Sequence, residues 1–145
     1  LEEAVKEATE LFQKDVAGQR IIETRTDFEK GLWIEMDPAH LRQILWNLLL
    51  NAAESIDAGG RISLRTFSTK NKHASMRISD NGCGMPPDTL QSIFDPFYTT
   101  KASGTGLGLS IVQRILDHYD ARLDVSSTPG EGTEFTVNFK QAPQG

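Results

Sequence analysis

Three glycines, Gly104, Gly106 and Gly108, alternate in the stretch ASGTGLGLSI, just before an apolar segment that predicts a helix. Glycine loses more backbone entropy on ordering than any other residue, so a glycine-rich helix start is costly unless bare backbone is needed there. The first N–H groups of a helix lack intrahelical partners and lie at the positive end of its dipole. The stretch therefore predicts a phosphate-binding helix start. The alternative, a flexible linker, would not lead directly into a patterned helix.

The overall composition fits one ordinary globular domain. The chain has 145 residues, of which 38% are hydrophobic, enough to bury a sizeable core. A net charge of -5 argues against nucleic-acid binding as the main role. Cys83 is the single cysteine, so an internal disulfide is excluded and a reducing compartment is indicated. No apolar run is long enough to cross a bilayer, and we expect a cytoplasmic domain without direct membrane contact, whose parent protein can still be membrane-anchored.

The first part of the chain predicts two helices separated by two short strands. Residues 1–15 predict a helix leading in from an upstream module, and residues 20–26 and 32–36 predict the strands. A helix over about 37–57 begins with Asp as its N-cap and Pro at its first position. The apolar face of the first helix is Leu1, Ala4, Val5, Ala8, Leu11 and Phe12. The apolar face of the second is Leu41, Ile44, Leu45, Leu48, Leu49, Ala52 and Ile56.

The remainder predicts a helix among strands that are joined by short turns. The strands are expected over residues 61–67, 75–80, 122–127 and 134–139. A hairpin loop is expected over 68–73, a helix over about 107–119, and a polar tail over 140–145. The core face of that helix is Leu109, Val112, Ile115 and Leu116. Closely adjoining strands favour an α+β fold, a mixed sheet covered by helices on one face.

Asn47 and Asn51 are one helical turn apart, so their side chains project together beside the apolar face. Amide oxygens are hard, neutral ligands, suited to Mg²⁺ that is held mainly by substrate phosphates. Asn is a poor helix former, so its repetition in a strongly helical segment favours such a role. The alternative is a solvated helix flank. Glu54, on the same strip, is interpreted as a surface residue, although it could hold a metal-bound water.

Asp80 continues the parity of Met76 and Ile78, so we expect its carboxylate on the core side of the sheet at the strand end. A buried carboxylate needs donors, and the amino group of adenine is one. Gly82 and Gly84 would let a flat ring lie against backbone. The alternative is a hairpin turn at Asn-Gly, which the following non-strand sequence MPPDTL weakens.

Two further residues are candidates for nucleotide contact. Thr133 shares the parity of Phe135 and Val137, so its hydroxyl would point to the same interior as Asp80 and reach the base through water. The simpler interpretation is a β-branched residue that starts a strand. Lys101 precedes the glycine stretch and could place a positive charge on the outer phosphates.

In their order along the chain, several segments resemble the ATP-binding catalytic domain of bacterial sensor histidine kinases, within the gyrase, Hsp90, histidine kinase and MutL superfamily. They are NLLLNAAES (N box), DNGCGM (first glycine box), IFDPF (F box), GTGLGL (second glycine box) and GEGTEF. The FDPFYTTK and GTGLGLSIV segments are similar to kinases of the nitrogen-regulation and pilus-regulation type. The resemblance implies a Bergerat fold, an α/β sandwich with a mixed, mostly antiparallel sheet and a mobile ATP lid over about 95–105.

The resemblance also implies roles for individual residues. Asn51 would hold Mg²⁺ with support from Asn47, Asp80 would bind the adenine amino group, and Phe94 and Phe97 would anchor the lid. Together with the candidates above, the predicted nucleotide-binding residues are Asn47, Asn51, Asp80, Gly82, Gly84, Lys101, Gly104, Thr105, Gly106, Leu107, Gly108 and Thr133.

Two departures from the family pattern bear on the reaction. Many sensor kinases have a basic residue where this chain has Glu54, and none of His40, His73 and His118 lies in a phosphoacceptor context. Gyrase and Hsp90 relatives have a glutamate base where this chain has Asn47, so rapid ATP hydrolysis is not expected. The expected acceptor is a histidine on the dimerisation module of the same kinase, which then serves a response regulator.

Other functions stay open at this point. One is a regulatory nucleotide-binding module that performs no transfer, and another is a gyrase- or Hsp90-like ATPase. We expect the isolated domain to be monomeric.

Overall fold

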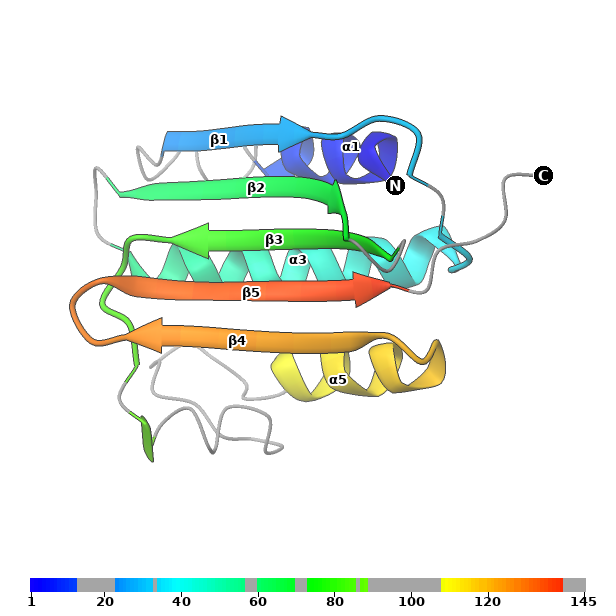
Figure 1. The fold of residues 1–145 in the computed structure, drawn as a ribbon. Coiled ribbons are helices and arrows are strands. Elements are labelled where there is room, and N and C mark those ends of the chain that lie inside the picture. The colour runs from blue at the N-terminus through cyan, green and yellow to red at the C-terminus, as the bar shows by residue number, and fades with distance from the viewer. Residues whose placement is uncertain are drawn as a thin grey trace.

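The computed structural model describes residues 1–12, 23–32, 34–56, 60–69, 73–85, 87–88 and 108–139. These residues form one layer of strands and one layer of helices (Figure 1). The main elements are α1 (Glu2–Phe12), β1 (Glu23–Phe28), α3 (Pro38–Ser55), β2 (Arg61–Ser68), β3 (Ala74–Asp80), α5 (Gly108–His118), β4 (Arg122–Thr128) and β5 (Gly132–Phe139).

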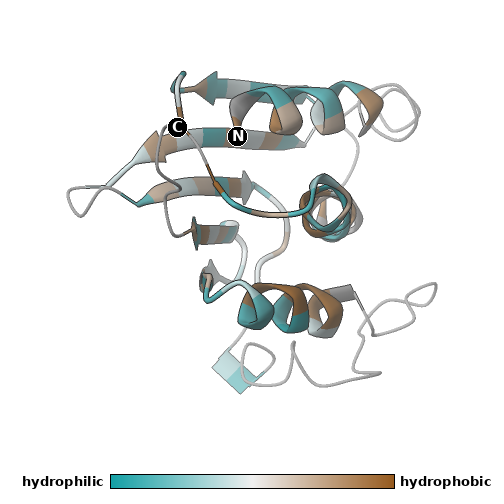
Figure 2. Ribbon diagram, turned by 90° about the vertical axis from the view of Figure 1, so that its right-hand side faces the viewer, coloured by the Kyte–Doolittle hydropathy of each residue, from teal (hydrophilic) through white to brown (hydrophobic). Residues whose placement is uncertain are grey.

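The five-stranded sheet has the order β1-β2-β3-β5-β4. Its β1 edge pairs parallel with β2, whereas the β2–β3, β3–β5 and β4–β5 pairs are antiparallel. Figure 2 shows α1, α3 and α5 on one side of this sheet. The prediction of a mixed, mostly antiparallel sheet with helices on one face is therefore confirmed.

The central helix α3 forms most of the contact between the two layers. Its start is capped as predicted, because the Asp37 carboxylate accepts a hydrogen bond of 2.8 Å from the Ala39 N–H and Pro38 occupies the first turn. α3 packs against α1, α5 and β3. All seven residues of its predicted apolar face are buried: Leu41, Ile44, Leu45, Leu48, Leu49, Ala52 and Ile56.

The flanking helices follow their predicted faces less completely. On α5, Val112 and Leu116 are fully buried, and the other two predicted positions are partly buried. On α1, the prediction is wrong for Leu11, which is 51% exposed. Thr9 is buried in its place, and its hydroxyl donates to the Val5 carbonyl at 2.7 Å. That bond satisfies the hydroxyl within the helix, so a polar residue can occupy a core position.

The strand predicted over residues 32–36 is also wrong. Of the residues described in this segment, 32 and 34–36, only Ile34 takes part in strand pairing, as an isolated bridge. The backbone turns at Gly31, where φ is +81°, and the helix cap begins at Asp37, so few residues remain for a strand. The Leu32 carbonyl accepts from the Leu1 nitrogen at 2.9 Å, which ties this connection to α1. The strand predicted over 20–26 is observed as β1, at Glu23–Phe28.

α3 and α5 are joined by Tyr119 at the start of α3. The Tyr119 hydroxyl accepts from the Asp37 N–H at 3.2 Å and lies 2.6 Å from His40 Nδ1. The exposed His118 ring packs edge-on against Tyr119. Packing against Tyr119 therefore accounts for both His40 and His118.

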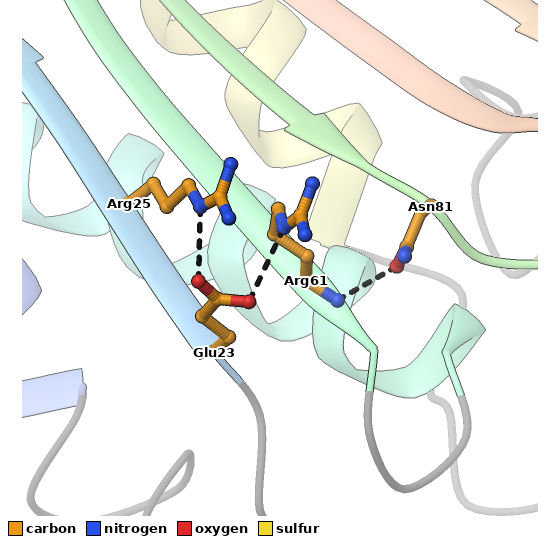
Figure 3. Close-up of polar contacts among 4 residues, drawn as sticks. All are labelled: Glu23, Arg25, Arg61 and Asn81. Atoms are coloured by element: carbon orange, nitrogen blue, oxygen red, sulfur yellow. Dashed lines mark hydrogen bonds and ion pairs between the residues drawn. The ribbon is translucent and has the colours of Figure 1, made fainter.

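The sheet face opposite the helices is polar. At its β1–β2 edge, Glu23 accepts from Arg25 at 2.9 Å and from Arg61 at 3.3 Å, as Figure 3 shows. The hydrogen bond from Arg25, followed by the one from Arg61, lowers the pKa of Glu23. Because the three side chains are exposed, water screens these pairs and they contribute little to stability.

Candidate functional site

Asp80 ends β3 on the helix-facing side of the sheet. Its register partners are Ile62 on β2 and Thr133 on β5, of which Ile62 is fully buried and Thr133 is 5% exposed. Side chains directly opposite one another on antiparallel strands lie about 5 Å apart at Cβ. The half-buried carboxylate of Asp80 and the hydroxyl of Thr133 are thus neighbours on the inner face, as strand parity predicted.

The loop after Asp80 fixes the position of this carboxylate. Asp80 Oδ1 accepts a 2.9 Å hydrogen bond from the Gly82 N–H. Asn81 pairs with Arg61 at the start of β2. Its side-chain oxygen accepts the Arg61 N–H at 2.7 Å (Figure 3), and its own N–H donates to the Arg61 carbonyl at 3.3 Å. The alternative of a hairpin at Asn-Gly is therefore wrong, since β3 pairs with β2 and β5 and residues 81–85 form no strand.

Glycine is required in this loop by close backbone packing. A Cβ on Gly84, where φ is +68°, would lie 2.1 Å from the Thr128 carbonyl oxygen. Beside this contact, the Gly130 N–H donates to the Cys83 carbonyl at 2.7 Å. The loop of residues 81–85 therefore rests on the β4–β5 turn. Packing alone explains glycine at position 84, independently of any bound ring.

Ser127 is a residue of this site that the sequence analysis missed. Its hydroxyl accepts the Met85 N–H at 2.7 Å, donates to the Gly132 carbonyl at 3.0 Å, and lies 2.8 Å from the Thr133 hydroxyl. One side chain of β4 thus connects the loop to the start of β5. A signal was present, because Ser127 shares the strand parity of the inward-facing Leu123 and Val125.

Asn47 and Asn51 lie one turn apart on α3, and both are half-buried. In the described ranges, no group of three or more His, Cys, Asp or Glu residues could hold a metal ion. Amide oxygens alone supply one or two neutral ligands, which suits Mg²⁺ that keeps water and phosphate ligands. The donor chemistry of the two asparagines therefore fits a cation that arrives with a phosphate chain.

The described elements of the site face one side of the molecule. In Figure 1, the end of β3, the beginning of β5 and the C-terminal half of α3 lie toward the left, and the start of α5 is the left-hand end of that helix. α5 begins at Gly108, close to the predicted start at residue 107. The predicted lid at 95–105, Phe94 and Phe97, and the predicted tail at 140–145 lie outside the described residues. So do the other predicted phosphate-binding residues, which are Lys101, Gly104, Thr105, Gly106 and Leu107.

Comparison with known proteins identifies the family. Residues 36–143 match the family described as histidine kinase-, DNA gyrase B- and HSP90-like ATPase, and the chain belongs to it. The chain is 41% identical over 129 residues to the signal transduction histidine-protein kinase AtoS of Escherichia coli, covering 86% of this chain and 21% of AtoS. It spans only about a fifth of that relative's length.

Solved structures give the same result for the fold. The catalytic domain of histidine kinase ThkA superposes with a TM-score of 0.85 at 28% identity, covering 96% of this chain and 91% of that one. Full-length ShkA in complex with AMPPNP gives 0.85 at 28% identity, covering 97% of this chain and 30% of ShkA. The resemblance to histidine kinase catalytic domains and the expected α+β fold are thus confirmed. Among the described residues, no helix is long and apolar enough to cross a membrane.

Proposed function

We propose that this chain binds Mg·ATP and donates the γ-phosphate to a histidine on a separate phosphoacceptor and dimerisation module of the same kinase. The observation that carries the proposal is the pairing of Asp80 with Thr133 on the sheet face that packs against α3, the helix that bears Asn51 and also contacts α5. Similarity to sensor histidine kinases supports it, as does similarity to ShkA, whose structure contains AMPPNP.

Asp80 and its loop would bind the adenine. The carboxylate, oriented by the Gly82 N–H, accepts a hydrogen bond from the exocyclic amino group. Its half-buried position makes this bond stronger than it would be in water, since competing solvent is partly excluded. Gly82 and Gly84 would form the wall against which the ring lies.

The phosphates would lie between α3 and the start of α5. Asn51, supported by Asn47, would hold Mg²⁺, which when bound neutralises phosphate charge. The first backbone N–H groups of α5 at Gly108 would bind phosphate oxygens, because they lie at the positive end of the helix dipole. We assign the same role to Gly104, Thr105, Gly106 and Leu107, a charge contact to Lys101, and the lid to residues 95–105.

These residues favour transfer to histidine over hydrolysis. In transfer, the histidine nitrogen forms a bond to the γ-phosphorus, the bond from that phosphorus to the bridging oxygen breaks, and ADP leaves. This chemistry depends mainly on positioning and charge stabilisation. Hydrolysis would also need a base for the attacking water, and Asn47, one turn before Asn51, has no useful basicity.

The proposal extends to partners and location. The phosphohistidine would pass its phosphoryl group to a response regulator in two-component signalling, with the domain working in the cytoplasm. The isolated domain would be a monomer.

A transfer assay tests the function directly. The chain is mixed with Mg²⁺, ATP labelled on its γ-phosphate and a purified histidine-containing helical module of a sensor kinase, and label on that module is counted. We expect label on the module and none when its histidine is replaced by alanine. Binding without transfer would indicate a regulatory nucleotide module, whereas steady-state phosphate release without the module would indicate an ATPase.

Asn51→Ala tests the metal assignment. Loss of its amide oxygen should abolish the Mg²⁺ dependence of ATP binding while adenosine binding is retained, both measured by calorimetry. Gln43→Ala, at an exposed position of the same helix, is the matched control and should retain the Mg²⁺ dependence. If Asn51→Ala also loses adenosine binding, the helix rather than the metal site has been damaged.

A further inference from the structure

Ser127 has a hydroxyl whose hydrogen-bonding capacity is fully used. A hydroxyl donates one hydrogen and accepts through two lone pairs. The Met85 N–H occupies one lone pair, at 2.7 Å. The Gly132 carbonyl can only accept, so the contact of 3.0 Å uses the Ser127 hydrogen. One lone pair remains for the Thr133 hydroxyl, at 2.8 Å.

This inventory determines the direction of the Thr133 hydrogen. Because Ser127 has already donated its hydrogen to Gly132, the Thr133 hydroxyl must be the donor in the bond between the two side chains. The oxygen of Thr133 then offers only lone pairs to its other surroundings. With 5% of Thr133 exposed, bulk water competes little for this arrangement.

The side chain beside Thr133, that of Asp80, is also a hydrogen-bond acceptor. Asp80 is the register partner of Thr133, and its ionised carboxylate accepts hydrogen bonds without donating any. Two acceptors therefore stand side by side at the end of the inner face. A ligand group that donates hydrogens matches both, whereas a carbonyl oxygen would face two acceptors without a hydrogen between them.

We propose that Ser127 is a positioning residue that directs the Thr133 hydroxyl hydrogen away from the base and so makes the site select 6-amino over 6-oxo purine nucleotides. The inference rests on the proposed function, because it assumes that a purine base lies against Asp80. Ser127 acts through Thr133, and its contribution lies in the choice between bases. In the absence of Ser127, the Thr133 hydroxyl can rotate and donate to a 6-oxo group.

Affinities for ATP and inosine triphosphate test the inference. The two nucleotides share ribose and phosphates, and the base of inosine has an oxo group at C6 and a hydrogen on N1 where adenine has an amino group and a lone pair. Dissociation constants with Mg²⁺ are measured for the wild type and Ser127→Ala by calorimetry. We expect the wild type to prefer ATP and the variant to lose about fivefold or more of that preference, the size of one net hydrogen bond.

Three further variants isolate the effect. Ser126→Ala removes the adjacent hydroxyl of β4, which is exposed on the opposite face, and should retain the wild-type preference. Thr133→Val removes the hydroxyl that Ser127 orients and should reduce the preference. Adding Ser127→Ala to Thr133→Val should change the preference no further, because the two residues act as one unit.

The outcomes distinguish this inference from the proposed function. A wild-type chain that binds no ATP would overturn both. If the wild type binds ATP and inosine triphosphate equally, or if Ser127→Ala weakens both equally, Ser127 only holds the loop and the inference is wrong while the function stands. Should Ser127→Ala fail to fold, Thr133→Val decides alone, since an unchanged preference in that variant overturns the inference.

Discussion

Two adjacent rows of side chains on β3 and β5 are both polar, yet they lie in different surroundings. The inner row, Asp80 and Thr133, faces the helices, and the outer row, Ser79 and Glu134, faces away from them. In the outer row, the Ser79 hydroxyl donates to Glu134 at 3.2 Å, and Arg77 lies 3.5 Å from the same carboxylate.

The two rows differ in the free-energy cost of removing their polar groups from water. Outer-row groups keep much of their hydration, since the Glu134 side chain is 43% exposed, and a polar residue there needs no special explanation. Inner-row groups lie beside a hydrophobic core and need partners at fixed positions, which the Gly82 N–H and Ser127 provide. Two polar pairs of similar composition thus differ in what they indicate: only the inner pair points to a ligand.

Gly132→Ala should have the largest effect of the variants, because it disrupts the pairing of β5 with β3 at the inner row. The residue has φ of +122°, and an added Cβ would lie 2.0 Å from the Asp80 carbonyl oxygen, so β5 would be forced away from β3. We expect a loss of about 3 kcal/mol or more in the free energy of unfolding, measured in urea. Gly130→Ala is the control, because φ is +79° there but nothing lies within 4 Å, and it should cost about 1 kcal/mol. Equal losses would contradict the packing argument.

Asp80→Asn should weaken ATP binding by about 1.5–3 kcal/mol, because an amide replaces a charged acceptor. Calorimetry with Mg·ATP measures the change. Ser79→Ala, one residue earlier on the outer row, should leave the affinity unchanged. An unaltered affinity in Asp80→Asn would mean that the inner row does not bind the base, so the two rows would not differ in function.

Glu134→Gln should have a smaller effect, on stability alone. The Arg77–Glu134 pair is partly exposed, so its contribution should be about 0.5 kcal/mol and should vanish in high salt. Urea unfolding at two salt concentrations measures it. Glu131→Gln, which removes a charge in the exposed β4–β5 turn, controls for net charge. A salt-independent loss would mean that the outer row is less hydrated than we describe.

The smallest effect should come from Glu23 on the outer face. Arg25 and then Arg61 lower the pKa of Glu23 below its ordinary value of 4.5. A carboxyl whose pKa is lowered by folding stabilises the folded state above its unfolded pKa, and this contribution is lost as pH falls through the folded pKa. Unfolding measured across the acid range should therefore show slightly less acid sensitivity in Glu23→Gln than in the wild type. Greater acid sensitivity in the variant would reverse the sign of this argument.

The same contrast explains how much the sequence could predict. Strand period alone predicted that Asp80 and Thr133 share the inner face, and the 3.6-residue period correctly gave the buried face of α3. Leu11 and the segment 32–36 were predicted wrongly, because burial of Thr9 depends on its bond to Val5 and the short segment is confined between a turn and a helix cap. The roles of Asn47, Asn51 and the glycine stretch stay predictions.

Ser127 illustrates what single-sequence patterns omit. Strand alternation alone predicts that the Ser127 side chain faces inward. Its role in the site, however, comes from three hydrogen-bond partners, among them Met85, which is 42 residues away in sequence. Contacts of this kind depend on which strands become neighbours, and no local period encodes that.

The packing of residues 81–85 against the β4–β5 turn has a consequence for folding during synthesis. Contacts such as Gly84 with Thr128 and Cys83 with Gly130 join segments that leave the ribosome far apart in time. The loop therefore lacks this part of its support until β4 and β5 have emerged and paired. The proposed base-binding function would therefore be acquired only after β4 and β5 have been made, and unravelling of the β4–β5 hairpin alone would be enough to lose it.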